Sequence, residues 1–190
     1  MMPSSTDRTT IRARVAAAAA IATLALAGCK THQRTDADNT PAVETALAPD
    51  GTEYPVLNTV DLGEGLIARD LRIGTGPEIK LDDVMVVHTV GTYPVGGPRG
   101  GRVFYSTIED GAPLTWPVKR LIQGWQRGVP GMKVGGIRTL SVPWPLAYGA
   151  EGKPNPEDPG AGIPPKADLH FTIELLGVNP PDFDRSDLPD

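Results

Sequence analysis

The chain has 190 residues, 39% of them hydrophobic and 22% charged, so one main globular domain is the default expectation. The formal net charge of -5 argues against a nucleic-acid partner, because phosphate binding needs a basic face. Three His and one Cys cannot build a structural zinc site of the usual kind, and a single Cys excludes a disulfide within the chain.

A short apolar run near the N-terminus follows a basic segment. Arg8, Arg12 and Arg14 precede residues 15–27, and this run is shorter than the roughly 20 residues that a membrane-spanning helix needs. A basic segment followed by a short apolar one is typical of a secretory signal. We therefore assign residues 1–28 to a signal peptide.

The signal ends in Leu-Ala-Gly-Cys, which resembles the lipobox of bacterial lipoproteins. The resemblance implies that Cys29 becomes lipid-modified, is the first residue of the mature protein and anchors it to a membrane. The alternative is an ordinary signal with an incidental cysteine at its end. In Gram-negative bacteria, an Asp directly after this Cys resembles an inner-membrane retention signal. Lys30 stands at that place, so the resemblance favours the outer membrane. We expect a protein lipid-anchored to the bacterial cell envelope, on the periplasmic side of the outer membrane in a Gram-negative cell.

The mature chain divides by composition into three parts. Residues 29–60 are polar and lack sustained periodicity, which is typical of a flexible tether. Residues 61–180 combine apolar periodic segments with many Gly and Pro and form the folded domain. Residues 181–190 form a short acidic tail that we expect to fray.

Most regular structure in the domain is predicted to be strand. The strand patterns cover residues 66–71, 84–90, 103–105, 137–142 and 169–175. Residues 93–102 are rich in Gly and Pro and form a hairpin loop or bulge, but they lack the GK[ST] ending of a phosphate loop. The pattern indicates an antiparallel sheet with one face to be covered, in an α+β domain.

The segment LIQGWQRGVPGM predicts a very short helix. The spacing of Leu121, Ile122 and Trp125 suits one helix face, and we expect the helix over residues 120–126. The Gly and Pro residues that follow end it almost at once. It is the only candidate in the sequence to cover the exposed face of the sheet.

Several segments occur in an order that is informative as a whole. They are Val86–His88 with Gly91, Val103–Thr107, Pro113–Trp116, Leu121–Trp125 with Gly128–Gly135, Ala147–Gly149 with Ile163–Pro165, and Phe171–Leu176. In order and composition they resemble the FK506-binding-protein (FKBP) type of peptidyl-prolyl cis-trans isomerase, over residues 65–178. The resemblance implies an FKBP-like antiparallel half-barrel sheet of about five strands wrapped around one short helix, with a ligand pocket between them.

The resemblance also implies which residues form the pocket. Trp125 would be the floor on which a proline ring stacks, Tyr148 would donate its hydroxyl to the substrate carbonyl, and the Ile122 N–H would donate to the ligand. With Phe104, these are the expected catalytic residues. The expected substrate-binding residues are Leu121, Ile163, Phe171, Tyr105 and Trp116.

Each pocket residue also has a purely structural interpretation. Phe104 and Phe171 lie on alternating strands, where an inward aromatic is ordinarily core. Trp125 alone is compatible with helix-to-sheet packing, Tyr148 with capping a loop, and Ile163 with a stiff loop. The sequence leaves these alternatives open.

Two positions depart from the family pattern. The family strand usually reads VHYTG with its Tyr in the pocket, and Thr89 stands at that place. The family usually reads FDS after it, and Tyr105 replaces the Asp, which removes a charge and adds bulk. Losing one net hydrogen bond costs about 0.5–1.5 kcal/mol. The Gly- and Pro-rich residues 149–162 are longer than in the smallest family members and are expected to shape the rim.

The implied activity is peptidyl-prolyl cis-trans isomerisation that assists folding of envelope or secreted proteins. Bond rotation needs no nucleophile, so no metal or cofactor is expected. Expected partners are proline-containing polypeptides, FK506-like macrolides and, through the lipid on Cys29, a membrane. The alternative suggested by Thr89 and Tyr105 is a non-catalytic FKBP-like binding or chaperone module. A third hypothesis is an envelope lipoprotein with a structural role.

Overall fold

The structure, a computed structural model, describes residues 43–95, 101–156 and 162–184. The chain divides into residues 1–40 and a unit formed by residues 41–190, and only the second contains described residues. The signal peptide, Cys29 and the last six residues of the acidic tail lie outside the described part. Within the described ranges, no helix has both the length and the apolar character needed to cross a membrane.

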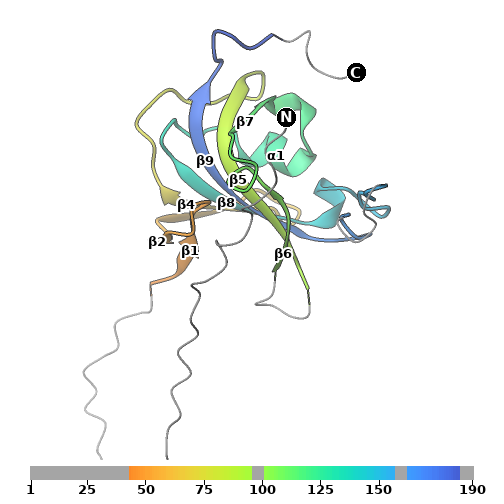
Figure 1. Cartoon of the computed structure of the whole chain (residues 1–190). Helices are drawn as coiled ribbons and strands as arrows, with labels where there is room; N and C mark the ends of the chain where they lie inside the picture. The colour runs from red at the N-terminus through yellow and green to blue at the C-terminus, as the bar shows by residue number, and fades with distance from the viewer. Residues whose placement is uncertain (1–42, 96–100, 157–161, 185–190) are drawn as a thin grey trace, which may run out of the picture. The chain divides into compact units, whose positions relative to one another are not determined.

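Regular structure in the described unit is mostly strand, as the sequence predicts. The strands are β1 Thr45–Leu47, β2 Glu53–Pro55, β3 Asn58–Asp61, β4 Ile67–Arg72, β5 Val84–Pro94, β6 Gly101–Ser106, β7 Leu114–Pro117, β8 Ile137–Val142 and β9 Leu169–Val178. The helices are the 3-10 helix η1 Val118–Arg120, the α-helix α1 Gln123–Gly128 and the 3-10 helix η2 Trp144–Leu146 (Figure 1).

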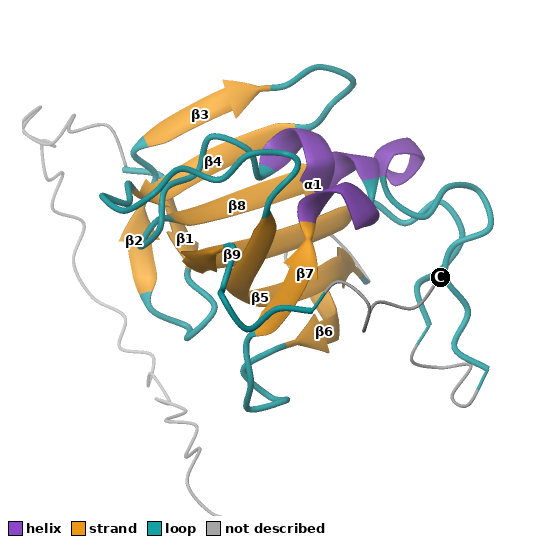
Figure 2. Ribbon diagram, turned by 90° about the horizontal axis from the view of Figure 1, so that it is seen from above, coloured by secondary structure: helices purple, strands orange, loops and turns teal. Residues whose placement is uncertain are grey.

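One antiparallel sheet contains seven of the described strands, in the order β3-β4-β8-β9-β5-β6 with β7 also paired to β5. Figures 1 and 2 show that the sheet curves and that α1 lies against one of its faces. The predicted class, an antiparallel sheet with one short helix, is confirmed. The sheet has more strands than the five or so expected, because β3 and β7 span only four residues each and give little periodicity.

Two glycines allow α1 to lie close to the sheet. A Cβ atom on Gly124 would be 2.3 Å from Val142 Cγ1, and one on Gly128 would be 2.7 Å from Leu140 Cδ2. Two glycines in six residues lower the intrinsic helix stability, so packing must hold the helix. The helix begins three residues later than predicted, because Leu121 and Ile122 have extended backbone conformations.

An ion pair ties the end of α1 to the sheet. Arg138 on β8 donates from Nη1 to the carbonyl of Gly128 at 2.8 Å and from Nε to the Asp70 carboxylate at 2.7 Å. The two side chains are only 14% and 10% exposed. Because the last carbonyls of a helix lack partners within it, this guanidinium satisfies one of them and links it to β4.

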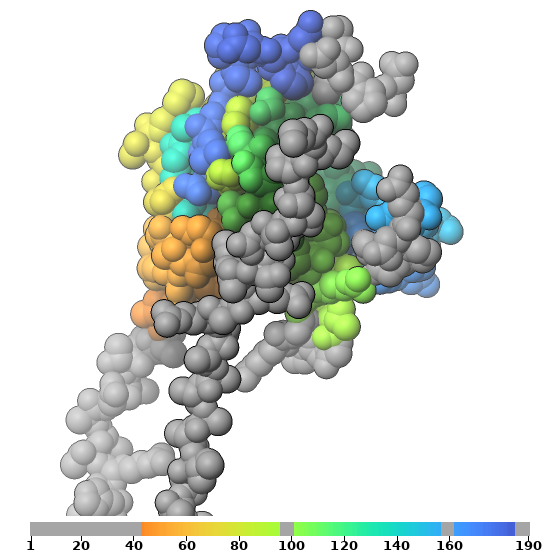
Figure 3. All heavy atoms as spheres, in the orientation of Figure 1, coloured from red at the N-terminus to blue at the C-terminus, as the bar shows by residue number. Residues whose placement is uncertain are grey.

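The predicted tether over residues 29–60 is wrong for its C-terminal half, where β1, β2 and β3 form. The β1–β2 hairpin places Ala48 in a buried cluster with Leu71 of β4 and Ile137 of β8. Figure 3 shows this hairpin, in orange, as part of the packed unit. Strands of three or four residues are too short to show a period of two, which explains why the sequence did not reveal them.

Candidate functional site

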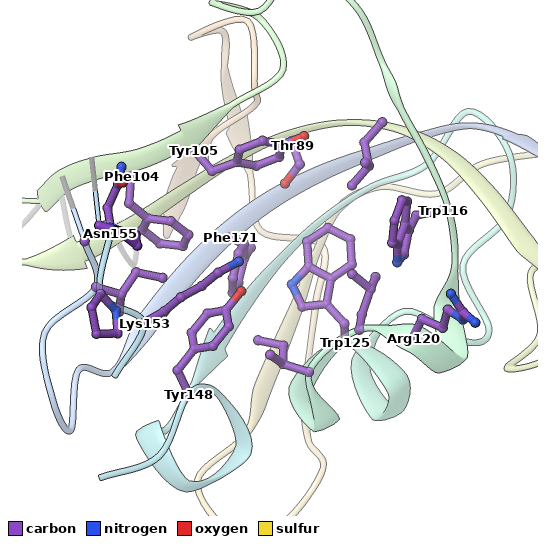
Figure 4. Close-up of a pocket in the computed structure, with 17 residues that line it drawn as sticks. Thr89, Phe104, Tyr105, Trp116, Arg120, Trp125, Tyr148, Lys153, Asn155 and Phe171 are labelled. Atoms are coloured by element: carbon purple, nitrogen blue, oxygen red, sulfur yellow. The ribbon is translucent and has the colours of Figure 1, made fainter. Parts of the chain in front are cut away.

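A cavity of about 650 Å³ lies beside α1 and the face of the sheet that α1 covers. All nine residues predicted to bind or process substrate line it (Figure 4). The full lining is Thr89, Phe104, Tyr105, Leu114, Trp116, Arg120, Leu121, Ile122, Trp125, Tyr148, Lys153, Pro154, Asn155, Pro156, Gly162, Ile163 and Phe171. The catalytic and binding roles of the nine residues stay predictions, but their side chains share one cavity.

Three aromatic rings form the floor and one wall. Trp125 is 3% exposed and meets Phe171 edge to face, with ring centroids 5.2 Å apart. Phe171 meets Phe104 in the same manner at 5.8 Å. Edge-to-face contacts fix the relative orientation of aromatic rings. The result is an apolar surface of defined shape against which a flat, apolar ring can pack.

Gly91 on β5 makes room for this aromatic wall. A Cβ atom at that position would be 2.7 Å from Phe104 Cζ and 3.1 Å from Phe171 Cε1. Any larger residue would push both rings out of place. A glycine inside a strand is a recognised sign that other groups approach the backbone closely, and here the approaching groups are the pocket aromatics.

A β-bulge brings Phe104 and Tyr105 into the same cavity. In the β5–β6 pairing Gly91 lies opposite Tyr105, whereas the next residue, Thr92, lies opposite Val103, so Phe104 is the extra residue. Neighbouring residues of a regular strand point to opposite faces, and a bulge breaks this alternation. Periodicity in the sequence therefore could not predict that both side chains line the site.

The two departures from the family pattern lie next to each other in the structure. The Thr89 side chain is fully buried, and its hydroxyl donates to the carbonyl of Thr172 at 2.8 Å. Figure 4 shows the Tyr105 ring beside Thr89. Burial and the charge of Asp110 raise the pKa of the Tyr105 phenol, so its hydroxyl stays protonated at neutral pH. Tyr105 does not fill the site, since it lines a cavity of about 650 Å³ that remains open beside it.

Tyr148 supplies a second phenol, from the turn after η2. Burial raises the pKa of its hydroxyl above the usual 10.0, so it is a hydrogen-bond donor at neutral pH. The Nζ atom of Lys153 lies 5.3 Å from the centroid of the Tyr148 ring. In Figure 4 the Tyr148 hydroxyl points into the cavity, as the predicted donor role requires.

The start of α1 forms the opposite side of the cavity. The Ile122 carbonyl accepts the N–H groups of Trp125 and Gln126 at 2.9 and 3.1 Å, which begins the helix. The Gln126 side chain donates to the carbonyl of Leu121 at 2.7 Å and holds this segment in place. Donation from the Ile122 N–H to a ligand stays a prediction.

Sequence reasoning did not identify the polar residues at the cavity edge. Arg120 lines it from η1, and Lys153 and Asn155 line it from the rim segment. The only signal was the Pro- and Gly-rich composition of residues 149–162, which predicted a rim without naming its side chains. Among the described residues, no group of three or more His, Cys, Asp or Glu is placed to hold a metal ion.

Comparison with known proteins points to one family. Residues 76–176, more than half of the chain, match the family model for the FKBP-type peptidyl-prolyl cis-trans isomerase. The chain is 35% identical over 116 residues to the probable FKBP-type peptidyl-prolyl cis-trans isomerase of Haemophilus influenzae, across 61% of this chain and 44% of that protein. It is 39% identical over 116 residues to the FK506-binding protein of Neisseria meningitidis, across 60% of this chain and 96% of that protein.

The solved structures agree. The crystal structure of FkpA from Escherichia coli matches with a TM-score of 0.55 and 34% identity, over 64% of this chain and 52% of that chain. Several curated relatives are much longer than the matched region. The chain spans 24% to 47% of the length of four of them.

Proposed function

The chain belongs to the family of FKBP-type peptidyl-prolyl cis-trans isomerases, and on that premise we propose that it catalyses isomerisation of prolyl peptide bonds. The observation that carries the proposal is the aromatic cavity with buried Trp125 as its floor. Its volume of about 650 Å³ is within the usual range for binding sites and accommodates a proline with its neighbours.

The chemistry requires only that the substrate amide be twisted. The barrier is about 18–20 kcal/mol because the C–N bond is partly double. A twisted amide has lost resonance and carries less charge on its oxygen, so an apolar, dry site favours the twisted state over the planar one. A thousandfold acceleration requires about 4 kcal/mol of such preference.

Each pocket residue has a role in this scheme. The proline ring packs on Trp125, between the edges of Phe104 and Phe171. The Tyr148 hydroxyl and the Ile122 N–H donate to carbonyl oxygens on the two sides of the ring and fix the chain on either side of the rotating bond. Leu121, Ile163 and Trp116 surround the substrate with apolar surface and exclude water.

Tyr105 is the residue that distinguishes this proposal from its alternative. If a carboxylate at this place were required for turnover, the domain would bind proline-containing segments without isomerising them. Three features support turnover instead: the cavity stays open beside Tyr105, the phenol is protonated, and Thr89 satisfies its own hydroxyl within the sheet.

The deciding experiment measures cis-to-trans exchange of a short Xaa-Pro peptide with purified residues 30–190. Wild type is compared with Trp125→Ala and Tyr105→Asp. Turnover in the wild type that is lost in Trp125→Ala supports the isomerase. An inactive wild type with an active Tyr105→Asp variant would establish the binding module, and three inactive proteins would favour a structural role.

We also propose that the protein is a lipoprotein of the bacterial envelope whose clients are envelope or secreted polypeptides. The support is the Leu-Ala-Gly-Cys sequence after a basic and apolar leader. Growth with a clickable fatty acid should label the protein, and Cys29→Ser should abolish both the label and sedimentation with outer membranes. Labelling that persists in Cys29→Ser would contradict the proposal.

We further propose that FK506-like macrolides bind to the aromatic cavity around Trp125, which competition in the exchange assay would test.

A further inference from the structure

Basic side chains line the cavity, although the protein is acidic. Lys153 enters from the rim and Arg120 from the end of η1, and none of the described lining residues is an Asp or Glu. The charge of Asp110 acts on Tyr105, on the β6 side of the site. Because the whole chain has a formal net charge of -5, it is notable that both charged side chains among the described lining residues are cations.

Lys153 is held in a defined position. Its backbone forms a bridge with Ile163 through two hydrogen bonds of 2.9 and 2.8 Å. Gly152 before it has φ of +71°, and Pro154 after it restricts the backbone further. The ammonium lies 5.3 Å from the centroid of the Tyr148 ring, a cation–π distance. Figure 4 shows the side chain reaching inward beside Tyr148.

We propose that Lys153 determines substrate specificity by selecting clients with an aspartate or glutamate next to the proline. The proposal rests on the isomerase function proposed above. With the proline ring on Trp125, the neighbouring side chain of the client reaches the cavity edge where the ammonium lies. An acidic side chain gains an ion pair there, and a basic one meets repulsion.

The expected effect is on substrate binding rather than on bond rotation. The ion pair forms with a flanking side chain, so it is equally strong in the planar and the twisted amide. Its influence therefore enters KM and leaves kcat unchanged. A partly exposed ion pair changes binding by about two- to fivefold, and attraction and repulsion add when acidic and basic peptides are compared.

The experiment compares Ala-Glu-Pro-Phe, Ala-Leu-Pro-Phe and Ala-Lys-Pro-Phe, and the same set with the charge after the proline, by NMR exchange spectroscopy. We expect the acidic peptide to have a KM about four- to twenty-five-fold below that of the basic one in wild type. Lys153→Met should bring the two within about twofold, Lys153→Glu should invert the order, and Lys153→Arg should retain it. High salt should reduce the preference.

Lys166 supplies a matched control. Its Nζ lies 5.9 Å from the centroid of the Trp144 ring, and neither of these residues lines the cavity. Lys166→Met removes the same charge from the same kind of contact and should leave the preference unchanged. Equal KM values for acidic and basic peptides in wild type, or an unchanged preference in Lys153→Met, would overturn the proposal.

The failure of this inference is distinguishable from failure of the isomerase function. Turnover of all peptides without regard to charge leaves the isomerase intact and rejects the role of Lys153. If no peptide turns over, the isomerase proposal fails, and NMR shift titration of the same peptides still tests the charge preference. Tighter binding of the acidic peptide that is lost in Lys153→Met then supports the selection, and equal binding rejects it.

Discussion

The floor of the cavity and its rim are built in different ways. Trp125 and Phe171 in the floor come from α1 and the long strand β9, are buried, and contact each other edge to face. The described rim has no long element, and the bridge between Lys153 and Ile163 holds its backbone. The floor thus depends on the whole sheet, whereas the rim depends on local contacts.

This difference separates the chemistry from the choice of substrate. A change in the floor alters the surface that favours the twisted amide, and it also alters the core. A change in the rim alters what lies on either side of the proline without disturbing the sheet. We therefore expect floor variants to lose stability or kcat, and rim variants to change KM and peptide preference.

The largest effect is expected where the floor is attached to the sheet. Arg138→Leu leaves the Asp70 carboxylate buried without its partner and frees the last turn of α1, so we expect a loss of about 3–5 kcal/mol in the free energy of unfolding. Urea denaturation of residues 30–190 measures it. The double variant Asp70→Leu/Arg138→Leu removes both charges and should recover most of the loss. A single variant as stable as wild type would show that the pair does not support the floor.

Trp125→Ala should have the next largest effect, on catalysis. Loss of a buried aromatic contact with the proline ring is worth about 1.5–3 kcal/mol, or roughly a 10- to 150-fold fall in kcat/KM. Trp144→Ala is the matched control, because Trp144 is half-buried and lies outside the cavity. Equal losses in the two variants would mean that the effect is general destabilisation, which circular dichroism would detect.

The sequence predicted the fold where elements are long and periodic. Residues 137–142 form β8 with the predicted bounds, and the strand predicted over residues 84–90 lies within β5. Residues 45–60 were misassigned because a short hairpin covering Leu71 and Ile137 has no period to detect. The residue pattern within a strand does not indicate that a segment distant in the sequence will cover its apolar face.

The site was predicted from the family resemblance rather than from periodicity. Alternation alone would separate Phe104 from Tyr105, and only the bulge in the β5–β6 pairing brings them together. Lys153 lies in a loop without periodic structure, and its place in the cavity depends on the bridge to Ile163. No pattern in the sequence indicates which residue forms the bulge or which two residues form the bridge.

Tyr148→Phe tests the junction of floor and rim. Loss of one net hydrogen bond of about 0.5–1.5 kcal/mol should lower kcat/KM by roughly 2- to 12-fold.

Burial raises the pKa of the Tyr148 phenol, so the hydroxyl remains a donor up to about pH 10.0. Its contribution to folding stability is fully present below pH 10.0, the unfolded-state value, and is lost as pH rises through the raised pKa. The activity of wild type should fall only above pH 10.0, and the fall should be smaller in Tyr148→Phe, where Tyr105 is the cavity phenol that still ionises. A fall in wild-type activity near neutral pH would assign the donor role to another group.

The smallest effect is expected in the rim, from Gly152→Ala. Gly152 has φ of +71°, and a Cβ atom there would be 2.4 Å from the carbonyl oxygen of Ile163, so the bridge that positions Lys153 must shift. We expect KM to rise about two- to fivefold, equivalent to roughly 0.5–1 kcal/mol, with kcat nearly unchanged and less preference for acidic peptides.

Gly111→Ala separates the broken bridge from backbone strain. Gly111 lies in the turn between β6 and β7 and has φ of +73°, but a Cβ atom there would meet no other side chain or backbone atom within 4 Å. It therefore carries the strain without the clash. Gly152→Ala should lose more stability than Gly111→Ala, because it adds the clash to the strain, and only Gly152→Ala should change KM and peptide preference. Equal KM values in both would show that the rim tolerates movement of Lys153, and would place the choice of substrate in the floor as well.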